Sequence, residues 1–411
     1  MVSTDTPASL VGTGRPQLES VLDRTLRWSA AQGYRGWNKH DGLNSPILRL
    51  LFGWSKWLRL VAIQGVMRFP TNIRPVLLVP KTYNPKGLAL FAQAWLDRFR
   101  VDQKRSSLEN AERLLALLMH LRSPGSWGGY CWGYHYPWQD PGFYAPTNTP
   151  NAVVTAFVCE AFLDAYRVTG RRDYLETVGA ALGFFFQDLK VLKDTPDELC
   201  LGYMPLPMTM RVMDVSILIA AVTAQHAALA NDESRRRDAC RLANYVVQRQ
   251  TAEGAWFYTD PPSDSRIRHD NYHTGFILDA LCRLMGATHD HRWQQIYWRG
   301  LDFYAKRLFN IDGSPRWMSD VDYPHDIHGA AQGILTFARH RDRYPGLAER
   351  TVRWTLERMY HPEGRFYYQE TRRFKKRFTL LRWCNAWTAR AFSSYLRQVR
   401  MSDTPDRKGE S

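Results

Sequence analysis

The stretch from residue 151 to 166 reads NAVVTAFVCEAFLDAY, an apolar helical sequence that opens with Asn151. Four later segments repeat this Ala- and Gly-rich design: DVSILIAAVTAQHAAL from 214, HTGFILDALCRLMG from 273, HGAAQGILTFARH from 328 and NAWTARAFSSYL from 385. A sixth copy, PKGLALFAQAWLDRF, begins at 85. Successive copies start 55 to 66 residues apart. A regular period of this length indicates an internal structural repeat.

Between these copies lie segments in which charged and apolar residues alternate at helical spacing, the pattern of a helix with one face in water. They cover residues 18–32, 107–122, 172–190, 234–250, 292–308 and 348–360. Six outer helices alternating with six apolar inner ones predict an all-α fold, an (α/α)6 toroid of six helical hairpins. An open stack of helix pairs is the alternative, but six near-equal pairs with long loops on one side favour a closed ring.

The domain prediction follows from the same pattern. Residues 1–16 are expected to form a disordered lead-in, 17–399 a single toroid with an insertion at 37–82, and 400–411 a disordered tail. The lead-in lacks the apolar core of an export signal, and no uninterrupted apolar run reaches the length of a membrane-spanning helix. Six scattered cysteines without a CxxC pair suggest neither a disulfide framework nor a zinc ribbon. We expect a cytoplasmic protein without metal or cofactor.

The composition narrows the choice of partner. The 411 residues carry 55 basic and 40 acidic side chains, a net charge of +15, with 45% hydrophobic residues and 15 Trp. Such a chain is globular, and its positive charge favours acidic partners. Nucleic acid is disfavoured because Lys and Arg are spread over all the outer helices and form no single stripe.

The predicted topology places the functional site. Every loop from an outer to an inner helix emerges on one rim, and these are the long loops: 123–150, 191–213, 251–272, 310–326 and 361–384. The inner helices therefore begin at one mouth of the toroid. Helix N-termini carry positive partial charge and suit carboxylates and anionic ligands.

The loop 127–144, WGGYCWGYHYPWQDPGFY, is the richest in aromatic residues. Tyr and Trp combine an apolar face with a hydrogen-bonding edge, which suits the faces and rims of sugar rings. The candidates for substrate binding are Trp127, Tyr130, Trp132, Tyr134, Tyr136 and Trp138. The alternative is that some of these side chains only plug the loop against the toroid.

Two helix starts concentrate side chains able to transfer protons, RHDNYH at 268–273 and DVDYPHDIH at 320–328. With carboxylates from neighbouring repeats, the catalytic candidates are Asp140, Asp214, Asp270, His273, Tyr323, Asp326 and His328. Further substrate-binding candidates are Arg268, His269, Asn271 and His325. Helix capping is the simpler explanation for Asp214, Asp270 and Asp326. A metal site is disfavoured, because no HxxxH or HxH pair completes a ligand set.

The stretch 47–67 carries Trp54 and Trp57 among Arg49, Lys56 and Arg59. A basic segment with Trp can lie on an anionic membrane, here the inner membrane. The alternative is a packing plate within the insertion.

Three motifs carry a resemblance to known proteins: GWNKHDGLNSP at 36–46, NPKG at 84–87 and HDNYHTGF at 269–276. They resemble bacterial exopolysaccharide-biosynthesis proteins of the VpsJ type, over residues 33–396. The helical hairpins, with turns such as EGAW at 253–256, resemble the six-hairpin glycosidase superfamily. The resemblance implies a role in making or trimming surface polysaccharide and assigns no catalytic residue.

Several functions follow from these residues. A glycoside hydrolase needs two carboxylates flanking the bond, which the four Asp candidates can supply. A lyase on a uronic-acid polymer instead uses His or Tyr as base, with Asn271 or Arg268 neutralising the carboxylate. Alternatives are a sugar 2-epimerase using His273 and His328, or a non-catalytic glycan-binding part of a synthesis complex at the inner membrane. The expected partner in every case is an oligo- or polysaccharide, acidic for the lyase.

Overall fold

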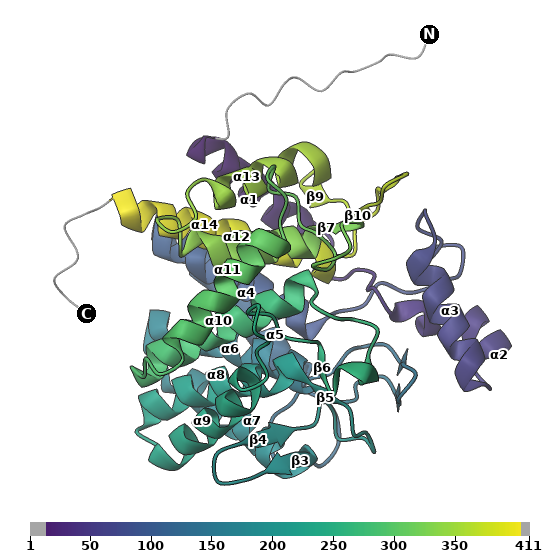
Figure 1. The fold of residues 1–411 in the computed structure, drawn as a ribbon. Helices are drawn as coiled ribbons and strands as arrows, with labels where there is room; N and C mark the ends of the chain where they lie inside the picture. Colours follow the sequence, from purple (N-terminus) through teal and green to yellow (C-terminus); the bar gives the residue numbers. More distant parts are fainter. Residues whose placement is uncertain (1–13, 404–411) are drawn as a thin grey trace.

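The computed structural model describes residues 14–403, so the predicted lead-in up to residue 13 and the tail from 404 lie outside the described residues. Twelve α-helices within this range alternate between an outer and an inner ring (Figure 1). The outer ones are α1 (Arg15–Ala31), α5 (Arg105–His120), α7 (Arg172–Gly183), α9 (Glu233–Val247), α11 (Gln294–Arg307) and α13 (Leu347–Trp354). The inner ones are α4 (Pro85–Asp102), α6 (Ala152–Thr169), α8 (Met213–Ala230), α10 (Asn271–Thr288), α12 (Ile327–Ala338) and α14 (Trp387–Asp403).

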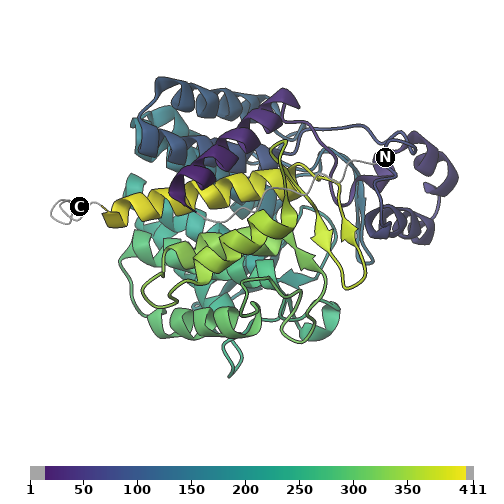
Figure 2. The same ribbon diagram turned by 90° about the horizontal axis from the view of Figure 1, so that it is seen from above.

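The inner ring is closed. Each inner helix packs against the next, and α14 returns to pack against α4. Each outer helix packs on an inner one, with α1 against α14 at the seam, as the view from above shows (Figure 2). The predicted (α/α)6 toroid is confirmed, and the open stack of helix pairs is excluded.

The inner helices are buried on nearly all sides because they are rich in Ala and other apolar residues. In α8 every residue from Met213 to Gln225 is buried. This helix is long and apolar enough to cross a membrane, but 78% of it is buried inside the toroid. Asn84 and Asn151 begin α4 and α6 by accepting hydrogen bonds from the backbone N–H groups of Gly87 and Val154.

Short π-helical turns extend three of the helices: η2 (Phe184–Asp188) after α7, η4 (Thr355–Met359) after α13, and η5 (Arg382–Ala386) before α14. The toroid boundaries differ slightly from the prediction. α1 begins at Arg15, within the expected lead-in, and α14 continues to Asp403, within the expected tail.

The rim loops pair through short antiparallel strands. Within single loops, β1 (Trp138–Gln139) pairs with β2 (Tyr144–Ala145), β3 (Val191–Asp194) with β4 (Leu199–Leu201), and β8 (Tyr360–His361) with β9 (Arg365–Phe366). Between repeats, β5 (Arg211–Val212) pairs with β6 (Thr259–Asp260), while β10 (Gln369–Glu370) joins β7 (His325–Asp326) to β11 (Lys375–Lys376). A short 3-10 turn, η3 (Pro262–Asp264), follows β6. These pairings tie loops of different repeats into one collar.

Residues 37–82, the insertion lobe, stand off from the toroid at the right of Figure 1. Backbone hydrogen bonds between Gly36 and Thr82 close the lobe at its base. It contains η1 (Asp41–Asn44), α2 (Pro46–Phe52) and α3 (Lys56–Arg68), packed around a small apolar core of its own. A buried ion pair at 2.7 Å joins the Arg74 guanidinium to the Asp41 carboxylate.

Candidate active site

The inner helices begin at one end of the toroid, under the collar, and their first turns bring acids and bases together. Asp270 directly precedes α10, yet its side chain caps no backbone group. Its Oδ2 lies instead 2.7 Å from Nδ1 of His273. The rings of Tyr258 and Tyr272 flank His273, with centroids 4.5 and 4.2 Å away. A carboxylate held on Nδ1 fixes the imidazole and leaves Nε2 for a substrate proton.

Asp214 lies in the first turn of α8 and is buried. Its Oδ1 has no hydrogen-bond partner among the described residues. Burial raises the pKa of Asp214, while the nearby charges of His273 and Lys86 oppose the rise. A buried carboxyl with a raised pKa tends to keep its proton, as a general acid must.

His328 lies in the first turn of α12 and is also buried. Neither of its ring nitrogens has a hydrogen-bond partner within residues 14–403. The ring stacks on Tyr272 at 4.6 Å and lies 4.4 Å from Trp387. Burial, followed by the charges of Lys86 and Arg382, holds the pKa of His328 well below its ordinary value. The imidazole is therefore neutral.

Three buried cations complete the site. Lys86, in the first turn of α4, holds its Nζ 3.7 Å from the centre of the Phe157 ring. Lys39, at the start of the insertion lobe, lies 4.0 Å from the Trp383 ring, and Arg382 lies 4.8 Å from the same ring. Burial lowers the pKa of Lys39 to about 8 and that of Lys86 well below its ordinary value. An anionic ligand would favour the protonated, positively charged forms of these buried basic side chains.

At the opposite end of the toroid the buried charged side chains are paired. They form direct ion pairs, such as Arg283 with Glu160 at 3.0 Å and Arg339 with Asp279 at 2.7 Å. At the mouth, by contrast, buried polar atoms stand without partners among the described residues. These atoms belong to His40, Tyr136, Asn151, Asp214, His328, Arg382 and Trp387. Unsatisfied buried polar groups are costly, and those at the mouth make it a candidate ligand site, although other such atoms, for example in Gln332 and Thr223, lie elsewhere in the toroid.

Part of the predicted aromatic cluster reaches this site. Tyr134 stacks on Tyr136 at 5.1 Å and meets the edge of Trp138 at 6.2 Å. Trp138 in turn stacks against His40 at 5.5 Å. Asp140 lies at the margin, where burial raises its pKa. These side chains form the wall between the toroid and the insertion lobe.

The other three predicted aromatic residues do not line the mouth, so the prediction that they bind substrate is corrected. Trp132 is fully buried and donates its indole N–H to the Leu118 carbonyl at 2.7 Å. Trp127 packs edge-on against Phe184 in the extension of outer helix α7. Tyr130 lies under the guanidinium of Arg122. Trp132 and Trp127 pack the loop against the outer helices, which was the simpler alternative, while Tyr130 is exposed at the surface.

Some side chains of the segment 320–328 face the mouth and others face away from it. Asp326 reaches the mouth, but fixed donors hold both of its oxygens: the His328 N–H at 2.9 Å, the Trp383 indole at 2.6 Å and the Gln369 amide at 2.7 Å. Asp326 therefore positions its neighbours. Tyr323 and His325 instead line a separate cavity of about 450 Å³ with charged residues of α13 and β10.

Three residues near the start of α10 also turn away from the mouth. Arg268 is exposed and ion-pairs with Asp320. His269 packs against Phe257, with ring centres 4.3 Å apart. Asn271 donates to the Leu308 carbonyl at 2.8 Å and accepts from the Tyr304 hydroxyl at 3.1 Å, so its amide anchors the helix start. Neighbouring positions on a helix start face different sides, which the sequence pattern did not resolve.

Sequence reasoning assigned no chemistry to Lys39, His40, Lys86 or Arg382. A signal was present for Lys86, because it is the only charged residue in the run from 85 to 96, whose one uncharged polar side chain is Gln93. For metal binding, the described residues hold no group of three or more His, Cys, Asp or Glu side chains placed to bind an ion. All six cysteines are free thiols.

No protein-family model and no curated protein matches the sequence. Solved structures do match. A D-mannose isomerase aligns over 94% of this chain and 98% of its own at 10% identity, with a TM-score of 0.64. An unsaturated glucuronyl hydrolase specific for heparin aligns over 95% and 99% at 11% identity, with a TM-score of 0.62. A GH76 alpha-mannanase from Bacteroides thetaiotaomicron aligns over 78% and 87% at 14% identity, with a TM-score of 0.59.

These matches show that the chain has the same (α/α)6 toroid fold as these solved structures. At such identities they show the fold alone. The resemblance to exopolysaccharide-biosynthesis proteins stays a prediction.

Proposed function

We propose that this protein is a carbohydrate-active enzyme that cleaves glycosidic bonds in an acidic oligo- or polysaccharide at the mouth of the toroid. The observation that carries the proposal is the pairing, on neighbouring inner helices, of a proton-holding carboxyl with an oriented base. Asp214 is the general acid. The Asp270–His273 pair is the general base.

Either of two reactions uses this pair. In hydrolysis, His273 takes a proton from water as the water attacks the anomeric carbon, and Asp214 protonates the departing glycosidic oxygen. In elimination, His273 takes the proton from carbon 5 of a uronic acid. The bond from carbon 4 to the glycosidic oxygen then breaks, a C4=C5 double bond forms, and Asp214 protonates the oxygen.

The proposed acidity of the substrate rests on the three buried cations. Lys39, Lys86 and Arg382 bring positive charge into a site where both lysines already have lowered pKa values. A sugar carboxylate between them would be bound by charge-assisted hydrogen bonds and would relieve their mutual repulsion. In elimination, it would also be neutralised as the neighbouring C–H bond breaks.

A sugar 2-epimerase is the second candidate. The specific observation in its favour is His328, a neutral imidazole with two unpartnered nitrogens, starting the helix next to that of His273. Two such bases can remove and return a proton at one sugar carbon. This reaction would incorporate solvent deuterium at that carbon without shortening the glycan, and His328→Asn would abolish the incorporation.

The biological setting is part of the same proposal. The three motifs that resemble exopolysaccharide-biosynthesis proteins include Lys39, His40, Lys86 and His273, all of which lie at the mouth. This coincidence supports a role in making or trimming surface polysaccharide, with the enzyme acting in the cytoplasm.

The test is a screen of uronate-containing and neutral oligosaccharides, with products followed by mass spectrometry and by the ultraviolet absorbance of unsaturated sugars. We expect cleavage of acidic substrates that is lost in Asp214→Asn and His273→Asn. Arg268→Gln, at an exposed ion pair away from the mouth, is the matched control and should cleave normally. Glycan binding without product, unchanged in both active-site variants, would identify a non-catalytic binding component instead.

A further inference from the structure

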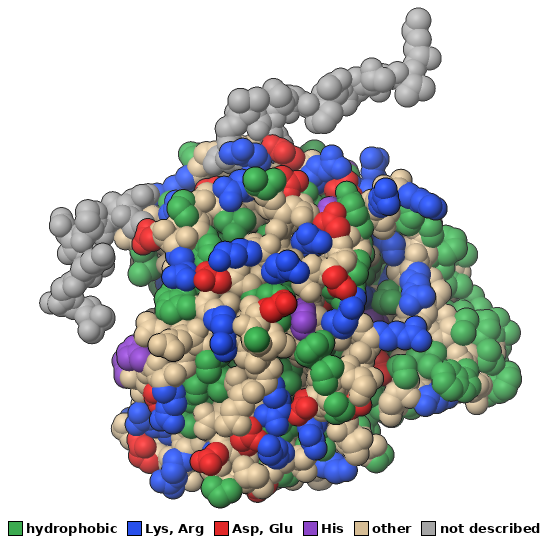
Figure 3. All heavy atoms as spheres, in the orientation of Figure 1, with side chains coloured by type: hydrophobic (Ala, Val, Ile, Leu, Met, Phe, Trp, Pro, Cys, Tyr) green, Lys and Arg blue, Asp and Glu red, His purple; other side chains and the backbone are tan. Residues whose placement is uncertain are grey.

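The insertion lobe carries just over half of the large apolar and aromatic side chains that are exposed in the described chain. Nine of the seventeen large apolar or aromatic side chains exposed within residues 14–403 belong to it: Ile47, Leu50, Leu51, Trp54, Trp57, Val61, Phe69, Val76 and Leu78. Leu50 is 82% exposed and Trp54 77%. They form the apolar surface at the right of Figure 3. Monomeric proteins rarely expose a contiguous apolar patch of this kind without a partner.

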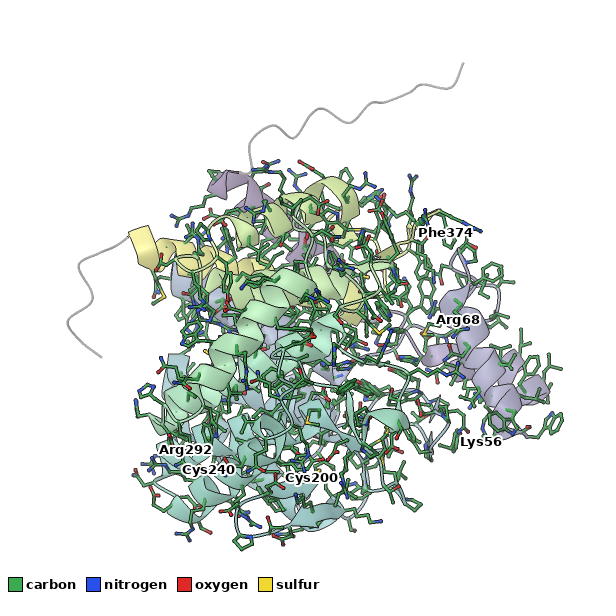
Figure 4. All side chains as sticks on the ribbon, viewed as in Figure 1. Lys56, Arg68, Cys200, Cys240, Arg292 and Phe374 are labelled. Atoms are coloured by element: carbon green, nitrogen blue, oxygen red, sulfur yellow. The ribbon has the colours of Figure 1, made fainter. Side chains whose placement is uncertain are left out.

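The sequence of the lobe after Asp41 carries charge of one sign, although Asp140 of the neighbouring loop lies near Lys56. No Asp or Glu occurs between Asp41 and Asp97, a run of 55 residues with seven Lys or Arg. Two of the cations in the lobe are engaged, since Arg74 pairs with Asp41 and Arg59 binds Gln139. Arg49, Lys56, Arg68 and Lys81 are exposed. Lys56 and Arg68 lie on the same side of the molecule as Phe374, a further exposed aromatic side chain of the collar (Figure 4).

We infer that the insertion lobe docks on an anionic lipid bilayer. Trp and Leu among Lys and Arg, without acidic residues, is the composition of helices that lie in the membrane interface. The 13 residues of α3 extend about 20 Å, short of the roughly 30 Å hydrocarbon core, so the helix lies along the surface. A protein partner or a second copy would not require the strict absence of acidic residues, whereas anionic headgroups repel them.

The docking surface and the mouth belong to the same lobe. Lys39 and His40 begin the lobe and line the mouth. Trp138 of the mouth packs on the small core of α2 and α3. The Lys376 ammonium of the collar donates to the Met67 carbonyl in α3 at 3.0 Å. A lobe seated on a bilayer would therefore hold the mouth close to glycans at the membrane surface.

Vesicle co-sedimentation of the full chain tests the inference. The probes are vesicles of phosphatidylcholine alone and of phosphatidylcholine mixed with the anionic phosphatidylglycerol. We expect binding to the anionic vesicles that weakens with added salt and falls about tenfold or more in the double variant Trp54→Ser/Trp57→Ser. Ile311→Ser is the matched control, because Ile311 is 92% exposed but lies outside the lobe. Leu50→Ser provides an independent check should the double variant fold poorly.

Charge is tested separately with Lys56→Glu/Arg68→Glu, which should lose about fivefold or more per cation. Arg292→Glu, on the opposite side of the molecule, should bind normally (Figure 4). Wild-type protein that ignores both vesicle types would overturn the inference, as would equal binding by the Trp variants. Dimerisation through Trp54 without vesicle binding would identify a second copy as the occupant. No substrate is needed, so the result is independent of the proposed reaction.

Discussion

Lys39 provides a test of the active site that requires no knowledge of the substrate. Its side chain is buried over the Trp383 ring, and burial lowers its pKa from 10.5 to about 8. Each pKa unit corresponds to about 1.4 kcal/mol, so holding the charge in the native state at neutral pH costs about 3 kcal/mol. The contact with Trp383 returns about 1 kcal/mol. Lys39→Met keeps the aliphatic packing and should raise the free energy of unfolding at neutral pH by about 2 kcal/mol.

The pH dependence gives the sharper result. Between the native pKa of about 8 and the unfolded value of 10.5, the unfolded chain binds more protons than the native state. The unfavourable contribution of Lys39 to the free energy of unfolding of the wild type therefore becomes smaller as pH rises through that window. The advantage of Lys39→Met should shrink by about 2 kcal/mol between about pH 7.5 and about pH 9.5.

Urea unfolding of both proteins, followed by tryptophan fluorescence, measures this difference, and other titrating groups cancel in it. A variant less stable than the wild type at neutral pH, or an advantage independent of pH, would refute the reasoning. Lys39→Met should also weaken the binding of acidic oligosaccharides. In that case Lys39 lowers the stability of the protein and strengthens the binding of its ligand.

Three further predictions concern substitutions of single residues. Asp326→Ala removes the helix cap and the Trp383 hydrogen bond, and should destabilise the protein by about 3 kcal/mol in urea. Burial raises the pKa of Asp214, so the native state holds this proton more tightly than the unfolded chain. Stability should therefore fall as pH rises through the native pKa, and Asp214→Asn should flatten that decline in unfolding curves measured above about pH 4. Gly364→Ala should lower the melting temperature by several degrees, because φ is +94° and a Cβ would lie 2.5 Å from the Arg24 carbonyl. In Gly286→Ala a Cβ meets no atom within 4 Å, and this variant should be neutral or slightly stabilising.

The fold could be predicted because the sequence repeats the same helical hairpin pattern. An apolar helix at each of six near-equal intervals fixes the number of hairpins, and alternation with amphipathic helices fixes which ring each joins. The mouth could also be located, since every inner helix must start at the same end. Asp214, Asp270, His273 and His328 were placed at the mouth in this way, while their chemical roles stay predictions.

The rest of the site depends on tertiary packing. Trp132 and Trp138 stand six residues apart in one aromatic loop, yet the first plugs an outer helix while the second faces the lobe. A loop has no helical or strand period from which the direction of a side chain can be read. Lys39 and Arg382 come from opposite ends of the sequence, and only closure of the toroid brings Lys39 to the ring of Trp383, the residue that follows Arg382.

That closure has a consequence for the order of events in synthesis. α14 is the last of the described elements to be synthesised, and it must pack against α4, about 290 residues earlier in the chain, to complete the ring. Arg382 and Trp383 arrive just ahead of it. A nascent chain that still lacks this segment holds Asp270 and His273 but lacks the guanidinium and the indole above them. The mouth should therefore be completed only after residues 382–403 have been synthesised, in the single step that closes the ring.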